Sequence, residues 1–430
     1  MNKMREMGYE MVAVSSPGCE LDELREVDGF KTYAVSMARH ISVISDVRSL
    51  FNMISVFRKE RPQVVHSMTP KAGLICMLAA WLTRVPVRIH TFTGLVWPTA
   101  TGLKRRILMT TDWMTCACAT HIIPEGQGVM NDLRNGGITK KPMKVLGYGN
   151  VRGVDMERFN MAKASSIEAT PRFNMADAGS IEADASVQGS IEADASVQGS
   201  IEACASVQGS IEADASVQGS IEADASVQGS IEADASVQGS IEATKPFTSF
   251  TFLFVGRIVG DKGINELVVA FGRLQKKYKG VRLMLVGEYE ENLDPVKVET
   301  REEIERNSAI MECGVKNGDD LLIAYNDADC FVMPSYREGF PNTVLEAGAM
   351  GLPCIVTDIN GSREIIEEGK NGLIVAPKDS DALYAAMERM LTDDTAREEM
   401  QRNARPMIES RFEKGFVQKC LIDYYKEILK

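Results

Sequence analysis

Apolar and polar residues alternate along this chain in short blocks that are typical of strands separated by helices. Apolar runs of strand type lie at residues 10–15, 64–66, 87–90, 250–256, 281–287, 329–334 and 354–358. Stretches with helical patterning separate many of them, including residues 45–60 and 71–83. Strands that alternate with helices are typical of a parallel sheet covered by helices, so the pattern predicts an α/β protein. Ligands of such sheets bind beyond the carboxyl ends of the strands.

A ten-residue repeat interrupts this pattern. From residue 181 to residue 240 the unit Ile-Glu-Ala-Asp-Ala-Ser-Val-Gln-Gly-Ser occurs six times, and only Cys204 departs from identity. Each unit carries two apolar side chains larger than alanine, which is too few to bury a core or to stack as a solenoid. We therefore expect disorder or a fluctuating helix in this segment.

The repeat lies between two parts that are each long enough to form a domain. A chain of 430 residues is too long for a single hydrophobic core. We predict an N-terminal domain at residues 1–158, a low-complexity linker at 159–248, a second domain at 249–412 and a final helix at 413–430. An insertion between two domains disturbs neither core.

The repeat also explains the net charge of −12. Residues 181–240 hold six Glu and five Asp without Lys or Arg, which gives −11 and leaves the remainder near −1 (−12 minus −11). A nearly neutral remainder argues against a nucleic-acid-binding protein. The nine cysteines are scattered and odd in number, so they do not form a disulfide framework. We expect a cytoplasmic protein, because no run has transmembrane length and residues 1–8 lack the apolar core of a signal peptide.

The chemistry of the chain centres on residues 335–346, Ser-Tyr-Arg-Glu-Gly-Phe-Pro-Asn-Thr-Val-Leu-Glu. A strand precedes them, and Pro341 suits the first position of a helix that follows. Unpaired amides and the helix dipole make such a corner a binding site for phosphate. Glu338 offers acceptor oxygens for sugar hydroxyls, and Glu346 offers them for a ribose. The alternative is a solvated loop glutamate and a second glutamate on an exposed helix face.

This stretch closely resembles the motif of retaining glycosyltransferases with the two-domain GT-B fold, of the family 4 type. The resemblance covers most of the chain outside the repeat and is strongest in residues 249–378. It implies two Rossmann-like parallel-sheet domains that face a cleft, with a final helix that crosses back onto the first domain. It also implies transfer of a sugar from a nucleotide donor, with UDP expected, to a glycan acceptor that we expect to be lipid-linked, in cell-surface polysaccharide synthesis.

The resemblance assigns residues by position. It implies donor binding by Gly256, Arg257, Lys262, Gly339, Phe340, Pro341, Asn342, Thr343 and Glu346, and catalytic roles for Glu338 and His90. The two cations would neutralise the charge that develops on the leaving diphosphate. Enzymes of this fold lack the Asp-x-Asp metal site of the other major glycosyltransferase fold, so neither a metal ion nor a cofactor is expected. A surface ion pair is the alternative for each cation.

His90 opens the sequence His-Thr-Phe-Thr-Gly at the end of a predicted strand. The resemblance places this loop beside the transferred sugar, where the imidazole or the backbone would contact it. The alternative is a histidine with structural hydrogen bonds only. His66, at the end of the preceding strand, is the weaker candidate, since polar residues often cap helices for structural reasons.

Three adjacent cations, Lys104, Arg105 and Arg106, begin an apolar-rich helix. An enzyme that acts on a lipid-linked acceptor could use them against the anionic inner face of a membrane. Most such runs are solvated helix faces.

This chain differs from the family at its start. Members of the family have a further strand, a loop and most of a helix before the strand at residues 10–15, and the present sequence does not include them. We expect activity to depend on that strand, which is central in the first sheet of the family. Two alternatives therefore remain, namely a nucleotide-sugar-binding protein inactivated by truncation and another GT-B enzyme such as a nucleotide-sugar epimerase.

Overall fold

The computed structural model describes residues 1–37, 43–166, 249–290 and 294–429, together with short pieces of the repeat. The chain divides into two compact units. The first comprises Met1–Ser166, Phe252–Leu274 and Leu283–Lys430, and the second comprises Ile167–Thr251 and Gln275–Arg282. The candidate site residues belong to the first unit.

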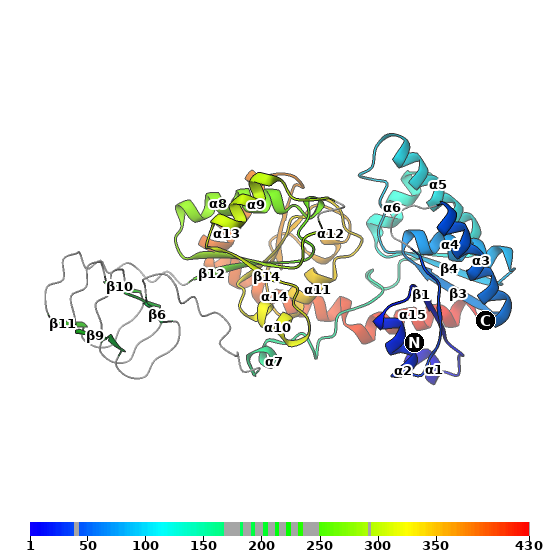
Figure 1. The fold of residues 1–430 in the computed structure, drawn as a ribbon, viewed down its shortest axis with the longest axis horizontal. Helices are drawn as coiled ribbons and strands as arrows, with labels where there is room; N and C mark the ends of the chain where they lie inside the picture. The colour runs from blue at the N-terminus through cyan, green and yellow to red at the C-terminus, as the bar shows by residue number, and fades with distance from the viewer. Residues whose placement is uncertain are drawn as a thin grey trace. The chain divides into compact units, whose positions relative to one another are not determined.

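The N-terminal part alternates strands and helices as predicted (Figure 1). Its elements are α1 (Asn2–Glu6), β1 (Val12–Ser15), α2 (Cys19–Glu26), β2 (Lys31–Ala34), α3 (Val43–Glu60), β3 (Val64–Met68), α4 (Pro70–Leu82), β4 (Val87–Phe92), α5 (Gly102–Cys118), β5 (His121–Pro124), α6 (Gln127–Asn135) and α7 (Met161–Ser166). Helix α4 packs between α3 and α5. It is apolar around most of its circumference because it is covered from several sides.

The strands of this part form two separate parallel sheets. One has the order β1-β2 and the other the order β3-β4-β5. The core of the part lies between strands and helices, with Phe57, Met77, Phe92 and Ile122 among its buried side chains. The additional first strand that the family has would precede Met1, so the expectation that activity depends on it stays a prediction.

The C-terminal part contains a six-stranded sheet with the order β14-β13-β12-β15-β16-β17, in which β12 pairs in parallel with β15, β13 with β14, β15 with β16 and β16 with β17. Its elements are β12 (Phe250–Val255), η1 (Gly260–Lys262), α8 (Ile264–Lys277), β13 (Val281–Val286), α9 (Val298–Arg306), β14 (Ile310–Gly314), α10 (Gly318–Asn326), β15 (Cys330–Met333), α11 (Asn342–Ala349), β16 (Cys354–Thr357), α12 (Ser362–Ile365), β17 (Gly372–Val375), α13 (Ser380–Thr392), α14 (Asp394–Phe412) and α15 (Lys414–Ile428). Strands β15 and β16 are completely buried, as expected for central parallel strands. The predicted α/β class with two parallel-sheet parts is confirmed.

The final helix, α15, packs against the N-terminal part, as the resemblance implies. Tyr424 is buried with Ile89 and Ile123 in one apolar cluster. The Tyr425 hydroxyl lies 2.7 Å from Nδ1 of His66. The last helix of the chain therefore completes the core of the first part.

Arg405 of α14 fixes the segment that leaves the N-terminal part. Its guanidinium donates to the carbonyl oxygens of Met156 (2.9 Å) and Phe159 (2.6 Å), and also to that of Ala349. Nearby, the amide of Val154 donates to the carbonyl of Phe412 over 2.9 Å. Backbone polar groups of this connection are thereby paired.

The described pieces of the repeat are six short strands. These are β6 (Ile181–Ala183), β7 (Ile191–Ala193), β8 (Ile201–Cys204), β9 (Ile211–Asp214), β10 (Ile221–Asp224) and β11 (Ile231–Asp234). They form two parallel sheets, β10-β8-β6 and β11-β9-β7, in which each isoleucine pairs with the isoleucine two units away. The expectation of a fluctuating helix is wrong for these strands. The expectation of disorder falls mostly on residues outside those that the structure describes.

The carboxyl end of α5 yields a stability prediction. The ammonium of Lys141 donates to the carbonyl oxygens of Cys116, Ala117 and Ala119 over 2.6–2.8 Å. These carbonyls at the helix end lack intrahelical partners, and a cation also complements the dipole there. We expect Lys141→Met to lower the free energy of unfolding by about 2 kcal/mol in urea titrations. Lys140→Met, at the exposed neighbouring residue, is the control and should change stability by less than about 0.5 kcal/mol.

Candidate active site

The candidate site is built on the loop between β15 and α11. The buried Ser335 follows the strand, and its carbonyl oxygen accepts a hydrogen bond from the Thr357 hydroxyl. The amide of Tyr336 donates to the carbonyl of Asp261 (2.8 Å), and its hydroxyl donates to Glu266 (2.6 Å). The loop is thus held on both sides, and Glu338 follows directly.

Lys262 and Glu338 form an ion pair, so the structure brings together two residues predicted from separate motifs. The two side chains are only 17% and 16% exposed. Gly263 allows the approach of the two segments, because its backbone is left-handed (φ 73°) and a Cβ there would lie 2.1 Å from the Pro334 carbonyl oxygen. Beside this pair, Arg337 lies 3.1 Å from the Asp261 carboxylate.

Arg257 lies at the carboxyl end of β12, as predicted, and pairs with Glu290. Its side chain is 43% exposed, so it remains accessible to solvent. Gly256 and Gly287 end their strands in close contact, since a Cβ on Gly287 would lie 1.8 Å from the Gly256 carbonyl oxygen. The loops that carry Arg257 and Glu290 are therefore placed next to each other by two glycines.

Helix α11 begins at Asn342, and Pro341 is its N-cap. Pro341 thus stands one residue before its predicted position at the start of the helix. The N-cap residue Pro341 makes no side-chain hydrogen bond to the first amides of α11. The side-chain oxygen of Asn342 accepts a hydrogen bond from Asn150 (3.2 Å), and the Thr343 carbonyl accepts one from Tyr325 (3.4 Å). The amides of the first turn form the kind of helix start that binds anions.

Phe340 and Gly339 are packing residues in this structure. Phe340 is 6% exposed and packs edge-on against Phe412, with ring centroids 5.4 Å apart. A Cβ on Gly339 would lie 1.8 Å from the carbonyl oxygen of Thr93. The backbone of the loop after His90 therefore contacts the backbone of the loop after Glu338.

Glu346 lies on α11, where its carboxylate accepts a hydrogen bond from the buried Tyr325 (3.1 Å). Burial raises the pKa of Glu346, while Tyr325, Arg152 and Arg158 act in the opposite direction. The side chain is half-buried, in contrast to the exposed helix face considered above.

His90 is buried and His66 half-buried, and both lie inside their strands, β4 and β3, rather than at the strand ends expected from the sequence. His90 is 1% exposed, its Nδ1 lies 2.8 Å from the Ser67 hydroxyl, and its ring packs edge-on against Phe92. Burial lowers the pKa of His90 to about 3 and that of His66 to about 4. His66 bridges Thr91 and Tyr425 over 2.7 Å each. Both imidazoles are therefore neutral at pH 7, and the role of His90 in catalysis stays a prediction.

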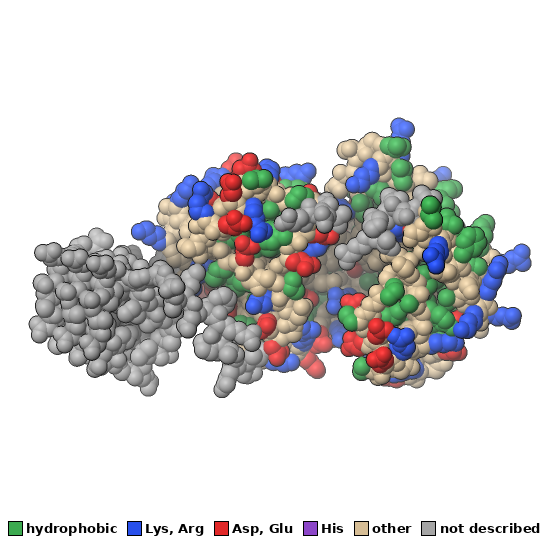
Figure 2. Space-filling view, viewed as in Figure 1, with side chains coloured by type: hydrophobic (Ala, Val, Ile, Leu, Met, Phe, Trp, Pro, Cys, Tyr) green, Lys and Arg blue, Asp and Glu red, His purple; other side chains and the backbone are tan. Residues whose placement is uncertain are grey.

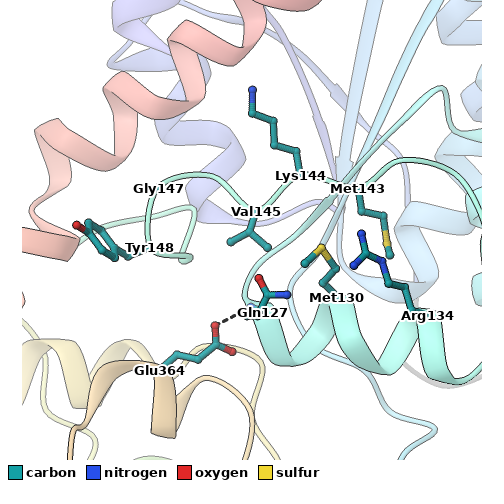
Figure 3. Close-up of a pocket in the computed structure, with 9 residues that line it drawn as sticks. All are labelled: Gln127, Met130, Arg134, Met143, Lys144, Val145, Gly147, Tyr148 and Glu364. Atoms are coloured by element: carbon teal, nitrogen blue, oxygen red, sulfur yellow. Dashed lines mark hydrogen bonds between the residues drawn. The ribbon is translucent and has the colours of Figure 1, made fainter.

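Sequence reasoning missed two carboxyl groups near the site. Glu125, after β5, is 6% exposed, and burial raises its pKa to about 8. Glu364 on α12 accepts a hydrogen bond from the amide of Gln127 (2.6 Å). Figure 3 shows this contact at the edge of a cavity of about 430 Å³. The cavity is lined by Gln127, Met130, Arg134, Met143, Lys144, Val145, Gly147, Tyr148 and Glu364. The motif Asn-Gly-Ser-Arg-Glu at residues 360–364 was the available sequence signal.

Lys104, Arg105 and Arg106 lie exposed on the first turns of α5, beside the exposed Leu103 and Ile107. Figure 2 shows hydrophobic and basic side chains together on the surface over α3 and α5. Within the described residues, no helix is long and apolar enough to span a membrane, and no group of three or more His, Cys, Asp or Glu residues could hold a metal ion.

Two family models match the chain on either side of the repeat. Residues 1–149 match a glycosyl transferase 4-like domain. Residues 240–407, which include the loop that carries Glu338, match glycosyl transferases group 1.

Curated relatives extend the match over nearly the whole chain. The capsular polysaccharide biosynthesis glycosyltransferase CapM of Staphylococcus aureus is 26% identical, over 99% of this chain and 92% of its own length. The UDP-Gal:alpha-D-GlcNAc-diphosphoundecaprenol alpha-1,3-galactosyltransferase of Escherichia coli is 23% identical, over 88% of this chain and 79% of its own. Among solved structures, sucrose-phosphate synthase from Thermosynechococcus elongatus shares the fold, with a TM-score of 0.68 at 17% identity over 99% of this chain and 90% of its own.

The burial of His90 predicts that the stability of the folded protein depends on pH. The pKa of His90 falls from 6.5 to about 3 on folding, so its neutral form contributes stability above pH 6.5, and this contribution is lost as the pH falls below 6.5. We expect His90→Asn to reduce the loss of unfolding free energy between pH 7 and pH 5 by about 2 kcal/mol. Urea titrations at the two pH values measure this. The same substitution at the half-buried His121 should reduce it less, and equal effects would contradict the assignment.

Proposed function

Because the chain belongs to the GT-B glycosyltransferases of the family 4 type, we propose that it transfers a sugar from a UDP-linked donor to a lipid-linked glycan with retention of configuration at the anomeric carbon. The observation that carries the proposal is the Lys262–Glu338 ion pair beside the start of α11. A cation, a carboxylate and the amino end of a helix meet there, and these are groups that bind a nucleotide sugar.

The donor diphosphate binds to Lys262 and Arg257 in this proposal. Both cations already pair with carboxylates, Glu338 and Glu290 respectively. A diphosphate carries more negative charge than one carboxylate, so it competes for both cations. When Lys262 turns to the diphosphate, Glu338 is released to accept hydrogen bonds from sugar hydroxyls. The exchange links donor binding to the orientation of the sugar.

Bond cleavage leaves negative charge on the diphosphate and positive charge on the sugar ring. Lys262, Arg257 and the first amides of α11 stabilise the leaving group. Glu338 and the amides of Gly339, Phe340 and Asn342 orient the sugar. Glu346 accepts hydrogen bonds from the ribose hydroxyls through lone pairs that do not accept from Tyr325. The acceptor hydroxyl attacks from the side of the leaving group, through an oxocarbenium-like transition state. The loop after His90 closes over the sugar and excludes water.

The buried His90 acts through its loop rather than as a proton donor. Its imidazole is neutral and buried against Ser67 and Phe92, so it fixes the strand from which the loop at residues 93–94 starts. Since two side-chain cations and helix amides supply the positive charge for the leaving group, the proposed reaction uses no metal ion.

The relatives support the classes of donor and acceptor. The name of the E. coli relative gives a UDP-galactose donor and an acceptor attached to diphosphoundecaprenol, and the name of the S. aureus relative gives capsular polysaccharide synthesis. A lipid-linked acceptor lies in a membrane, so the enzyme would work at the inner face of the cell membrane. We propose that Lys104, Arg105 and Arg106 contact anionic lipids there, with Leu103 and Ile107 entering the interface.

The transfer reaction is tested with purified protein, native membranes and a panel of labelled nucleotide sugars. We expect one donor to label the lipid extract, and Glu338→Ala to reduce the rate by about 100-fold or more. Lys262→Ala should also raise the KM for the donor. Glu409→Ala, at an exposed position on α14, is the control. The rate should be unchanged in EDTA, and a requirement for added metal would contradict the metal-free mechanism.

Two other results would replace the proposal. Turnover of the nucleotide sugar without acceptor would indicate an epimerase. Nucleotide binding without transfer, in the presence of native membranes, would indicate a binding protein.

Membrane contact is tested separately by sedimentation with lipid vesicles. We expect binding to vesicles that contain anionic lipid and little binding to neutral ones. Each Lys or Arg near an anionic surface contributes about 1 kcal/mol, so replacing Lys104, Arg105 and Arg106 together by Gln should weaken binding by about 100-fold. The matched control replaces three exposed cations of the C-terminal part, Lys276, Lys279 and Arg282, by Gln. Equal losses would show non-specific attraction.

A further inference from the structure

The amino end of α6 is capped by a residue from another part of the chain. The helix has nine residues, its N-cap is Gly126, and no side chain of the N-cap bonds its amides. The first amides of a helix have no intrahelical acceptor and need another partner. Here the partner is Glu364, on α12 of the C-terminal part.

Both carboxylate oxygens of Glu364 are used. One accepts from the amide of Gln127 at 2.6 Å (Figure 3), and the other accepts from the amide of Gly128 at 3.0 Å. The residues are 237 and 236 positions apart in sequence, so this is a tertiary contact and not a local cap. A carboxylate at a helix start also interacts favourably with the helix dipole, and hydrogen bonds to a charged acceptor are stronger than neutral ones.

The helix end is shaped to receive this carboxylate. A Cβ on Gly126 would lie 2.6 Å from the Glu364 carboxylate, and a Cβ on Gly128 would lie 2.2 Å from the side-chain oxygen of Asn360. Neither glycine has a positive φ. Close approach, rather than backbone conformation, therefore requires glycine at both positions.

A second contact supports the first. The side-chain amide of Asn360 donates to the Asp132 carboxylate over 2.6 Å. Arg363 holds Asn360 in place by donating to its oxygen over 2.6 Å, and it also pairs with Asp358 over 2.9 Å. The segment from Asp358 to Glu364 thus presents two ordered side chains to α6.

The same segment touches the loop proposed to orient the sugar. Gly361 has a left-handed backbone (φ 76°), and a Cβ there would lie 2.2 Å from the carbonyl oxygen of Gly339. Gly339 in turn contacts the backbone of Thr93. Movement of α12 relative to α6 would therefore move the sugar-orienting loop relative to the loop after His90.

We propose that Glu364, assisted by Asn360, is a positioning residue that latches the two halves of the site together by capping α6. When the latch is closed, the loops that contain Glu338 and Thr93 meet. When it opens, the amides of Gln127 and Gly128 return to water and the two loops separate. The proposal concerns the conformation of the protein, so it can be tested without knowing the sugar or the acceptor.

Hydrogen exchange of the whole protein, followed by mass spectrometry of overlapping peptides across residues 122–131, tests the latch. The first amides of a helix normally exchange fast, so protection at residues 127 and 128 reports the contact with Glu364. We expect Glu364→Ala to increase exchange there by about 10-fold to 30-fold, as loss of a charged hydrogen-bond acceptor implies. Glu364→Gln keeps one acceptor oxygen and should restore part of the protection. Glu399→Ala, exposed on α14, is the control.

Gly128→Ala distinguishes loss of the contact between α6 and the segment 358–364 from a general loss of stability. Alanine favours helix formation over glycine, whereas its Cβ would displace the Asn360 side chain that assists Glu364. We expect the same loss of protection as in Glu364→Ala. Gly272→Ala on α8, where a Cβ would meet only Glu303 at 3.8 Å, should leave exchange at residues 127 and 128 unchanged. Wild-type protection in either Glu364→Ala or Gly128→Ala would overturn the proposal.

Once a donor is known, kinetics adds a second readout. We expect Glu364→Ala and Gly128→Ala to lower kcat by about tenfold with a smaller change in the donor KM, because the donor cations lie elsewhere. Loss of protection without any change in kcat would overturn the positioning role.

Discussion

The candidate site depends on the ion pair between Lys262 and Glu338, two residues that are 76 positions apart in sequence. Both side chains are largely removed from water, so removing either leaves a charge without compensation. The pair forms because Gly263 lets its segment approach the Pro334 carbonyl, and because Tyr336 ties the loop to Asp261. Breaking such a pair without a replacement costs free energy, whereas a phosphate can replace the carboxylate of Glu338 as the partner of Lys262 and keep the charge compensated. Stability of the loop and readiness for a charged ligand thus have one physical origin.

Side-chain contacts, as well as the connecting segment, join the N-terminal and C-terminal parts of the chain. Helix α15 contributes Tyr424 to a cluster with Ile89 and Ile123, although α15 follows the C-terminal part in sequence. Arg405 binds the carbonyls of Met156 and Phe159 just after the N-terminal part. These contacts hold the connection, while the loops of the site approach each other closely at glycine positions. Backbone contacts at Gly339 and Gly361 leave little tolerance for larger residues.

Local patterns in the sequence predicted strands and helices, because apolar periodicity is a short-range signal, and the resemblance placed Lys262 and Glu338 in one site without predicting their ion pair. The resemblance predicted the crossing of α15. The cap that Glu364 provides could not be predicted, since it joins segments more than two hundred residues apart. The burial of His90 was also missed, because the strand predicted to end at residue 90 continues to Phe92 and keeps His90 within the sheet. In the repeat, counting apolar side chains did not anticipate in-register pairing of its isoleucines.

The carboxyl groups around α6 show how burial and charge can act together. Glu364 accepts two helix amides, whereas Glu125, one residue before the N-cap, is buried beneath the same helix start. Two adjacent carboxylates would repel each other, and burial in a site of low polarity makes that repulsion stronger. Burial raises the pKa of Glu125 to about 8, so at pH 7 this group is mainly protonated and adds little negative charge. The helix dipole of α6 is thereby left to attract Glu364 alone, which favours the contact between the two halves.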